Sequence, residues 1–223
     1  MYYSLSPAEA KEETTGFVWP QISNESPIYL NKGSNSVMNL VADKFPDFIP
    51  DLNYYELDKK AKLTDMLSGG KVNANGFVIS EKLKEIFERH YTVPTQYYPA
   101  KIKMENSFVD NYYLMQIVSD LSDNIDFRHS KFRVRKLVKD LGEIELVSKE
   151  DFRQKWDELL KTSMTITIRP DVFAMNNNFD NALDLFMINF MDFNVNISER
   201  LRNCLIEERV TGIQMKETNI VVK

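Results

Sequence analysis

The sequence has few of the side chains from which metal centres and covalent cross-links are made. It contains one cysteine and two histidines in 223 residues. Because Cys204 has no second thiol in the chain, an internal disulfide is excluded, as is usual for a reducing compartment. His90 and His129 belong to no HExxH or CxxC motif, so a zinc site would depend on scattered carboxylates. We therefore predict no metal site and no cofactor.

Export and membrane signals are also missing from the sequence. The first residues lack the positive charge and the apolar stretch of a secretory signal. The most apolar late stretch, 182–193, is interrupted by Asp184, Asn189 and Asp192. It is shorter than the roughly 20 residues that a membrane-spanning helix needs. We expect a cytoplasmic protein without a membrane partner.

Familiar catalytic motifs are absent as well, since there is no GxSxG elbow, P-loop or GxGxxG. Cys204 lies on the apolar stripe of a predicted helix, where a small buried side chain is commoner than a nucleophile. Paired carboxylates are the remaining source of hydrolase chemistry. The candidates are Glu143 and Glu145 on a predicted strand, and Asp120, Asp123 and Asp126 in a predicted loop. We predict a protein that is not an enzyme, with an enzyme of unrecognised type using a carboxylate pair as an alternative.

The composition that is present is that of an ordinary folded protein. Hydrophobic residues make up 43% of the chain and charged residues 27%, a balance that argues against disorder. The length fits one large domain or two modest ones. The formal net charge of −5 disfavours a general nucleic-acid binder, which needs a basic surface, and favours a basic partner.

Prolines divide the chain into two parts. Five of the eight prolines lie within the first 50 residues, a density that interrupts helices and strands. We interpret residues 1–70 as a loosely organised N-terminal part, in which 27–30 and 54–57 could pair as short strands. Residues 71–223 are interpreted as an α+β domain.

Two hexamers in the second part repeat each other. Residues 79–84 read ISEKLK and residues 197–202 read ISERLR, so they differ only by Lys/Arg exchanges. In each, an apolar strand precedes a serine typical of a helix N-cap, and a helical stripe of apolar residues follows. Further strands are predicted at 96–104 and 213–215. The repeat indicates either a duplicated strand–helix–strand unit or two independent examples of a common capped helix.

Further elements are predicted between the two repeats. Stretches 131–135, 143–147 and 165–168 alternate between polar and apolar residues, which is the period of a half-buried strand. Residues 149–161 carry the apolar stripe of a helix, and 180–190 fit either a helix or a buried strand. Because strands follow one another without regular βαβ alternation, the fold class is α+β, with mixed or antiparallel sheets and a few amphipathic helices.

A basic stretch leaves a nucleic-acid-binding module as another alternative. Residues 128–139 begin at Arg128, end at Lys139 and contain six basic side chains. On a strand, Lys131, Arg133 and Arg135 would share one face and could pair with Glu143 and Glu145 on a neighbouring strand. We favour this structural pairing and expect no nucleic-acid partner.

Tyrosines occur in four doublets, at 2–3, 54–55, 97–98 and 112–113. Adjacent residues of a strand face opposite ways, so each doublet is predicted to place one ring in the core and one outside. Exposed tyrosines are favoured at binding surfaces.

Several short motifs follow one another in a recognisable order. They are GFVISEKLK at 76–84, YYP at 97–99, NYYL at 111–114, DFRHS at 126–130, ISERL at 197–201 and TGI at 211–213. Together they resemble the bacterial immunity proteins of polymorphic toxin systems, in particular the group called immunity family eleven. The resemblance covers about residues 70–223, and the proline-bearing N-terminal region departs from the compact pattern.

This resemblance implies a protein that binds a cognate toxin from the same locus and blocks it in the cytoplasm by protein–protein interaction. It implies no catalytic residue and assigns no residue to the contact with the toxin. For that contact we predict the acidic loop that contains Asp120, Asp123 and Asp126, because it suits a basic toxin surface.

Overall fold

The computed structural model describes residues 1–23, 26–29, 31–70 and 75–222, and it has an α+β fold. Its strands are β1 (Tyr2–Pro7), β2 (Tyr55–Glu56), β3 (Met66–Leu67), β4 (Gly76–Ser80), β5 (Thr95–Met104), β6 (Ser107–Ile117), β7 (Lys131–Lys136), β8 (Lys139–Ile144), β9 (Ile166–Met175), β10 (Leu185–Met187), β11 (Val195–Ser198), β12 (Ile213–Glu217) and β13 (Ile220–Val222). Its α-helices are α1 (Glu81–Glu88), α2 (Lys149–Thr162) and α3 (Glu199–Glu207), and short 3-10 turns lie at Pro27–Tyr29, Val37–Asn39 and Ser122–Asn124. The predicted fold class is confirmed.

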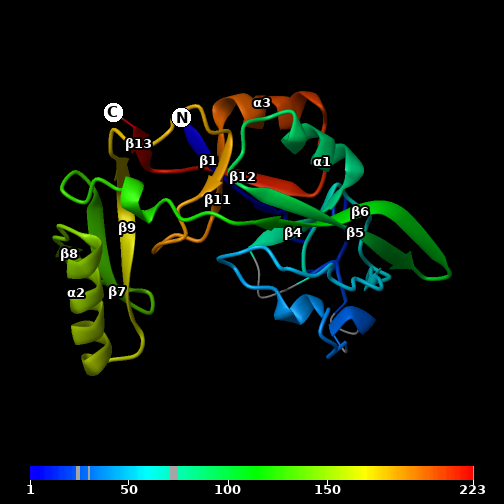
Figure 1. Ribbon diagram of the computed structural model, residues 1–223, viewed down its shortest axis with the longest axis horizontal. Helices are drawn as coiled ribbons and strands as arrows, with labels where there is room; N and C mark the ends of the chain where they lie inside the picture. The colour runs from blue at the N-terminus through cyan, green and yellow to red at the C-terminus, as the bar shows by residue number, and fades with distance from the viewer. Residues whose placement is uncertain (24–25, 30, 71–74, 223) are drawn as a thin grey trace.

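The described strands form three sheets (Figure 1). Their strand orders are β10-β11-β1-β12, β2-β5-β6-β4-β3 and β13-β9-β7-β8. Among the described pairs of neighbouring strands, two are parallel, β2 with β5 and β13 with β9, and the others are antiparallel. The sheets are therefore mixed and antiparallel, as the sequence predicts.

Two of the sheets contain the same four-strand arrangement. In the order β3-β4-β6-β5, helix α1 leads from β4 to β5, and in the order β10-β11-β1-β12, helix α3 leads from β11 to β12. In both, the strand between these two is antiparallel to each of them. This middle strand comes from different parts of the chain, because β6 follows β5 whereas β1 is the first strand. The strand–helix–strand repeat is thus present as a topological duplication.

Both duplicated helices begin at the serine that the sequence indicates. The Ser80 hydroxyl accepts the Leu83 N–H at 3.3 Å, and the Ser198 hydroxyl accepts the Leu201 N–H at 3.1 Å. A glutamate follows each cap, where the positive end of the helix dipole favours an anion. The two helices lie close to each other (Figure 1), and an ion pair of 3.5 Å between Arg89 and Glu208 joins their C-terminal ends.

The helices bury their apolar stripes against one shared core. Helix α1 buries Leu83, Ile86 and Phe87, and helix α3 buries Leu201 and Leu205. His90, two residues beyond the end of α1, places Nδ1 2.7 Å from the Ile86 carbonyl oxygen. It therefore closes the helix end, as a capping histidine does.

The tyrosine doublets 97–98 and 112–113 lie between this core and a second one under the N-terminal part. Tyr98 and Tyr112 are buried against residues from the first 60 of the chain. Their neighbours Tyr97 and Tyr113 are half-buried on the α1 side, where the Lys84 ammonium lies 5.6 and 5.1 Å from the two ring centroids. The prediction of one buried ring in each doublet is confirmed. The other ring is packed at the surface rather than free in solvent.

One predicted strand pair in the N-terminal part is wrong. Pro27–Tyr29 form a 3-10 turn, and Leu30 lies outside the described residues. Strand β2 instead pairs in parallel with β5, at Ile102 and Lys103. Pro27 lacks the N–H that a strand ladder requires, which disfavours the predicted pairing.

The contacts of the N-terminal part extend across residue 70. Strand β1 lies between β11 and β12, and the Met66 N–H donates to the Thr211 carbonyl oxygen at 3.2 Å. Strand β3 pairs with β4. The division of the chain into 1–70 and 71–223 stays a prediction. It can be tested by asking whether 71–223 folds without strands β1 and β3.

The remaining sheet and helix α2 form a lobe at one end of the molecule (Figure 1). We call β7, β8, β9, β13 and α2 the α2 lobe. Here β8 spans 139–144 instead of the predicted 143–147, because the tight turn at 137–138 sets its register against β7. Strand β9 continues past Pro170, which lies beside an irregularity in the pairing with β7. The ambiguous stretch 180–190 contains the short buried strand β10.

Candidate interaction surface

The predicted acidic loop meets the N-terminal end of helix α2. The Lys149 ammonium lies 3.8 Å from an Asp120 carboxylate oxygen and 3.5 Å from one of Asp123. It also contacts the Ser122 hydroxyl. Burial opposes ionisation of Asp120, but hydrogen bonds from Ser122 and the Lys149 charge outweigh it and lower the pKa of Asp120. Both carboxylates stay accessible, with 60% of the Asp120 side chain and 91% of the Asp123 side chain exposed.

The third predicted residue of this loop has a different environment. Asp126 Oδ2 lies 2.7 Å from His129 Nδ1, and 19% of the Asp126 side chain is exposed. Its backbone N–H donates to the Ala174 carbonyl oxygen at 2.8 Å, and its own carbonyl oxygen accepts from Ser130. The structure thus brings Asp120 and Asp123 to one cation, whereas Asp126 organises the turn that leads into β7.

An aromatic cleft lies beside the acidic loop. It has a volume of ≈ 490 Å³ and is lined by apolar side chains of α2 and of the loop 189–194. We call it the aromatic cleft and define it by Phe152, Trp156, Phe190, Met191 and Phe193. The Phe152 ring lies 5.8 Å from Trp156 in a stacked arrangement and 4.8 Å from Phe190 edge to face. Lys149 joins the cleft to the acidic loop, since its ammonium is 5.7 Å from the Phe190 ring centroid.

The loop that forms one wall of the cleft has an unusual backbone. Asn189 and Met191 have φ values of 55° and 58°, a left-handed conformation that side chains other than glycine rarely adopt. This conformation accompanies an exposed Phe193, 69% of which is accessible. In the same loop, burial raises the pKa of Asp192 despite hydrogen bonds from Asn194.

The floor of the cleft includes an open strand edge. Thr167, Ile168 and Arg169 of β9 line it. Strand β13 pairs with β9 only at 173–175, so no described strand covers the outer edge of β9 at 167–169. The cleft therefore offers backbone hydrogen-bonding groups next to aromatic surface, a combination suited to binding an extended protein segment.

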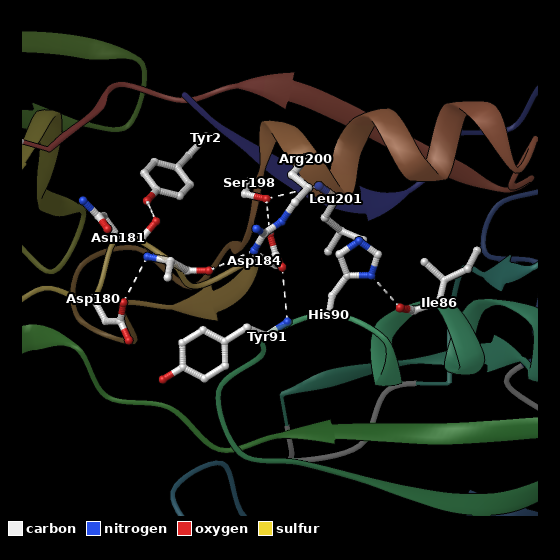
Figure 2. Close-up of polar contacts among 11 residues, drawn as sticks. Tyr2, Ile86, His90, Tyr91, Asp180, Asn181, Asp184, Ser198, Arg200 and Leu201 are labelled. Carbon is white, nitrogen blue, oxygen red and sulfur yellow. Dashed lines mark hydrogen bonds and ion pairs between the residues drawn. The ribbon is translucent and has the colours of Figure 1, made fainter.

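A separate polar cluster surrounds Asp184 (Figure 2). Its carboxylate is buried and accepts two hydrogen bonds from Arg200, of 3.0 and 2.7 Å. It also accepts the Ser198 hydroxyl at 2.5 Å and the Tyr91 N–H at 3.2 Å. Burial opposes ionisation, but the Arg200 guanidinium and the Ser198 hydroxyl outweigh it and lower the pKa of Asp184.

The Asp184 cluster has a counterpart in the other half of the duplication. The Asp65 carboxylate accepts the Ser80 hydroxyl at 2.8 Å and the Thr211 N–H at 2.8 Å, and Lys82 lies 3.9 Å away. In each half, the carboxylate holds the cap of one helix and a backbone N–H that follows the other helix. The recurrence indicates that Asp184 serves the fold rather than a reaction.

A protein-family model matches nearly the whole chain. This model, described as Immunity protein family (Imm11), covers residues 2–219. The chain belongs to the Imm11 family. A comparison with curated proteins gave no significant match. The family match extends the resemblance seen in the motifs to the proline-bearing N-terminal region.

Three structural findings concern membrane spans, metal ligands and the cysteine of this Imm11 chain. Among the described residues, no helix combines the length and apolar character needed to cross a membrane. Nor does the described part of the chain gather three His, Cys, Asp or Glu side chains that could hold a metal ion. Cys204 packs half-buried on α3, and burial raises the pKa of its thiol, which disfavours a thiolate nucleophile.

The basic stretch of the Imm11 chain is largely neutralised in the middle of β7. Arg133 contacts Asp171 and Asp140 at 2.7 Å each and Glu143 at 3.4 Å, and Arg135 lies 3.7 Å from Asp171. The predicted cross-strand pairing with Glu143 is confirmed, whereas Glu145 lies beyond the end of β8. These contacts occupy the central arginines of the stretch and leave its lysines at the surface.

Proposed function

We propose that this Imm11 protein is an immunity protein that binds a cognate toxin and neutralises it by direct protein–protein contact. The observation that carries the proposal is the family match over residues 2–219. The sequence motifs support it independently of the structure. The toxin would meet the protein in the cytoplasm, a reducing compartment that suits a chain with a single cysteine.

We assign the contact to the aromatic cleft together with Asp120 and Asp123. Half-exposed aromatic side chains lose much water-accessible apolar surface when a partner covers them, and they are frequent among the residues that dominate binding energy. In this cleft Phe152 and Trp156 come from a helix, so their positions are fixed before binding. Such preorganisation lowers the entropy cost of association.

The acidic loop adds a charge preference to this contact. Asp120 and Asp123 are exposed at one end of the cleft, and the whole chain carries a formal charge of −5. Exposed charges at the rim of an interface chiefly raise the association rate with an oppositely charged partner. The toxin surface that enters the cleft is therefore expected to be basic, with apolar side chains that fill the aromatic pocket.

Co-expression with the C-terminal domain of a large secreted protein, where an adjacent reading frame encodes one, tests the function. We expect the wild-type chain to rescue growth and to co-purify with that domain. Absence of both rescue and co-purification would contradict the proposed function.

Charge reversal tests the surface. The double change Asp120→Lys and Asp123→Lys should weaken binding about tenfold and reduce its dependence on salt. The matched control is Glu12→Lys with Glu13→Lys, two exposed acidic residues of the N-terminal part, of which Glu13 pairs with Lys11 in a comparable surface contact. Equal weakening by both pairs would indicate a net-charge effect and would remove the acidic loop from the interface.

A further inference from the structure

The hairpin that connects β7 and β8 ends in apolar side chains. Leu137 is 74% exposed, Val138 101% and Leu141 46%, and Met164, in the connection from α2 to β9, is 91% exposed. The Leu137 N–H donates to the Thr165 carbonyl oxygen at 3.2 Å, which places the hairpin beside the Met164 segment. We call these four residues the apolar tip. Exposed apolar side chains grouped in this way mark interaction sites in folded proteins.

The backbone of the apolar tip favours different residues from those it contains. The turn has two central residues between Lys136 and Lys139, and Leu137 adopts a φ of 54°. Glycine, asparagine or aspartate normally fill such positions, because they tolerate a left-handed backbone and remain hydrated. Leu137 therefore reduces local stability here, and the two side chains of the turn bury little surface in the isolated chain.

Positive charge borders the apolar tip. Among the described residues, neither Lys136 nor Lys139 has an ion-pair partner, whereas Arg133 and Arg135 farther along β7 contact carboxylates. The tip is thus basic in a protein whose formal net charge is −5. A partner that covers it without electrostatic cost presents apolar surface surrounded by acidic groups.

We propose that the apolar tip enters an apolar pocket with an acidic rim on the toxin, as a contact additional to the aromatic cleft. This inference rests on the proposed function and specifies the chemistry of the partner. The tip is convex and small, so it fits a concavity, where apolar pockets with a few polar groups occur. It acts as a concentrated set of binding residues within a larger interface.

Other partners fit the same residues less well. The tip has no aromatic side chain on which a nucleobase could stack. Its two lysines fall short of the clusters of roughly 4–8 basic residues that attract an anionic membrane. Addition of a partner strand to β8 is opposed by the irregular pairing at Val134 and Arg135 and by Gly142, which has a φ of 110°.

The double change Leu137→Gly and Val138→Ser tests the proposal. Glycine accepts the positive φ at position 137, so the hairpin should fold at least as stably as in the wild type. Binding to the purified toxin domain from the adjacent reading frame, measured by calorimetry, should weaken by at least about tenfold.

The charge reversal Lys136→Glu with Lys139→Glu should lower the association rate. Ile49→Ser, at an apolar residue of the N-terminal part that is 79% exposed, is the matched control and should bind as the wild type does.

Each outcome of this experiment has one reading. If wild-type and tip variants bind the toxin domain equally, the tip proposal is wrong and the proposed function stands. If the wild type does not bind, both are wrong. Duplex DNA and vesicles that contain phosphatidylserine serve as alternative ligands. If either one binds the wild type and not the tip variant, the assignment to a protein pocket is overturned.

Discussion

The duplicated core and the α2 lobe use their helices in opposite ways. Helices α1 and α3 bury leucine, isoleucine and phenylalanine side chains in a shared core. None of the 14 residues of α2, all of which lie in the described ranges, is buried. Its aromatic side chains are half-buried and line an open cleft. A helix that leaves its apolar stripe partly uncovered gives up stability and retains surface for a partner.

The carboxylates of the two regions also differ, since one set is bonded within the fold and the other is exposed to solvent. In the core, Asp65 and Asp184 each accept several hydrogen bonds from caps and backbone, so their charges are used within the fold. In the acidic loop that contacts the start of α2, the Asp120 and Asp123 side chains remain accessible. Stability and recognition are thus concentrated in different parts of one chain, which allows the recognition surface to vary without unfolding the core.

Removal of residues 1–70 should break the core most severely. The truncated chain 71–223 would lose β1, the strand between β11 and β12, and β3, the partner of β4. Each half of the duplication would then lack one of its four strands and expose an open edge. We expect no cooperative unfolding transition by circular dichroism. A sharp transition for 71–223 alone would instead establish it as an independent domain.

Two phenylalanine substitutions compare the core and the lobe directly. Phe87→Ala should destabilise the protein by about 4 kcal/mol, because the side chain is fully buried. Phe152→Ala should cost about 1 kcal/mol, because that ring is only half-buried in the aromatic cleft. Urea unfolding measures both. In binding to the toxin domain the order should reverse, with the larger loss for Phe152→Ala at a temperature where both variants are folded.

A good part of the fold follows from local patterns in the sequence. The hexamers at 79–84 and 197–202 identified both caps and both core helices, because capping and helical periodicity are local. The long strand β6 was not predicted as an element. The strand predicted at 27–30 is wrong, because Pro27 disfavours it. The duplication could be completed only with β1, whose place between two C-terminal strands depends on contacts some 200 residues apart.

The candidate site was predicted less well for a related reason. Asp120 and Asp123 stood out as clustered charges, but the aromatic cleft joins α2 to a loop that follows β10. Phe190 is the last residue of the stretch 180–190, which fits either a helix or a buried strand, and Phe193 lies beyond it. The sequence does contain a signal for the apolar tip. Leu137 and Val138 are consecutive apolar residues at the β7–β8 turn, where glycine or asparagine is expected. Exposure at such a position could be inferred from the sequence, whereas a cleft between distant segments could not.

The last comparison concerns the two equivalent carboxylates of the core. Asp184→Ala should destabilise the protein by about 2 kcal/mol and Asp65→Ala by about 1 kcal/mol. Only 1% of the Asp184 side chain is exposed, against 17% for Asp65, where water can replace the lost hydrogen bonds.

The pKa of Asp184 is lower in the folded state than in the unfolded chain. Its contribution is therefore complete above the unfolded pKa of about 3.9 and is lost as the pH falls through the folded value. Urea unfolding at pH 7 and at successively lower pH should show the wild type and Asp184→Ala converging below about pH 4. A constant difference across that range would mean that packing, rather than the ionised carboxylate, makes Asp184 important to this half of the duplication.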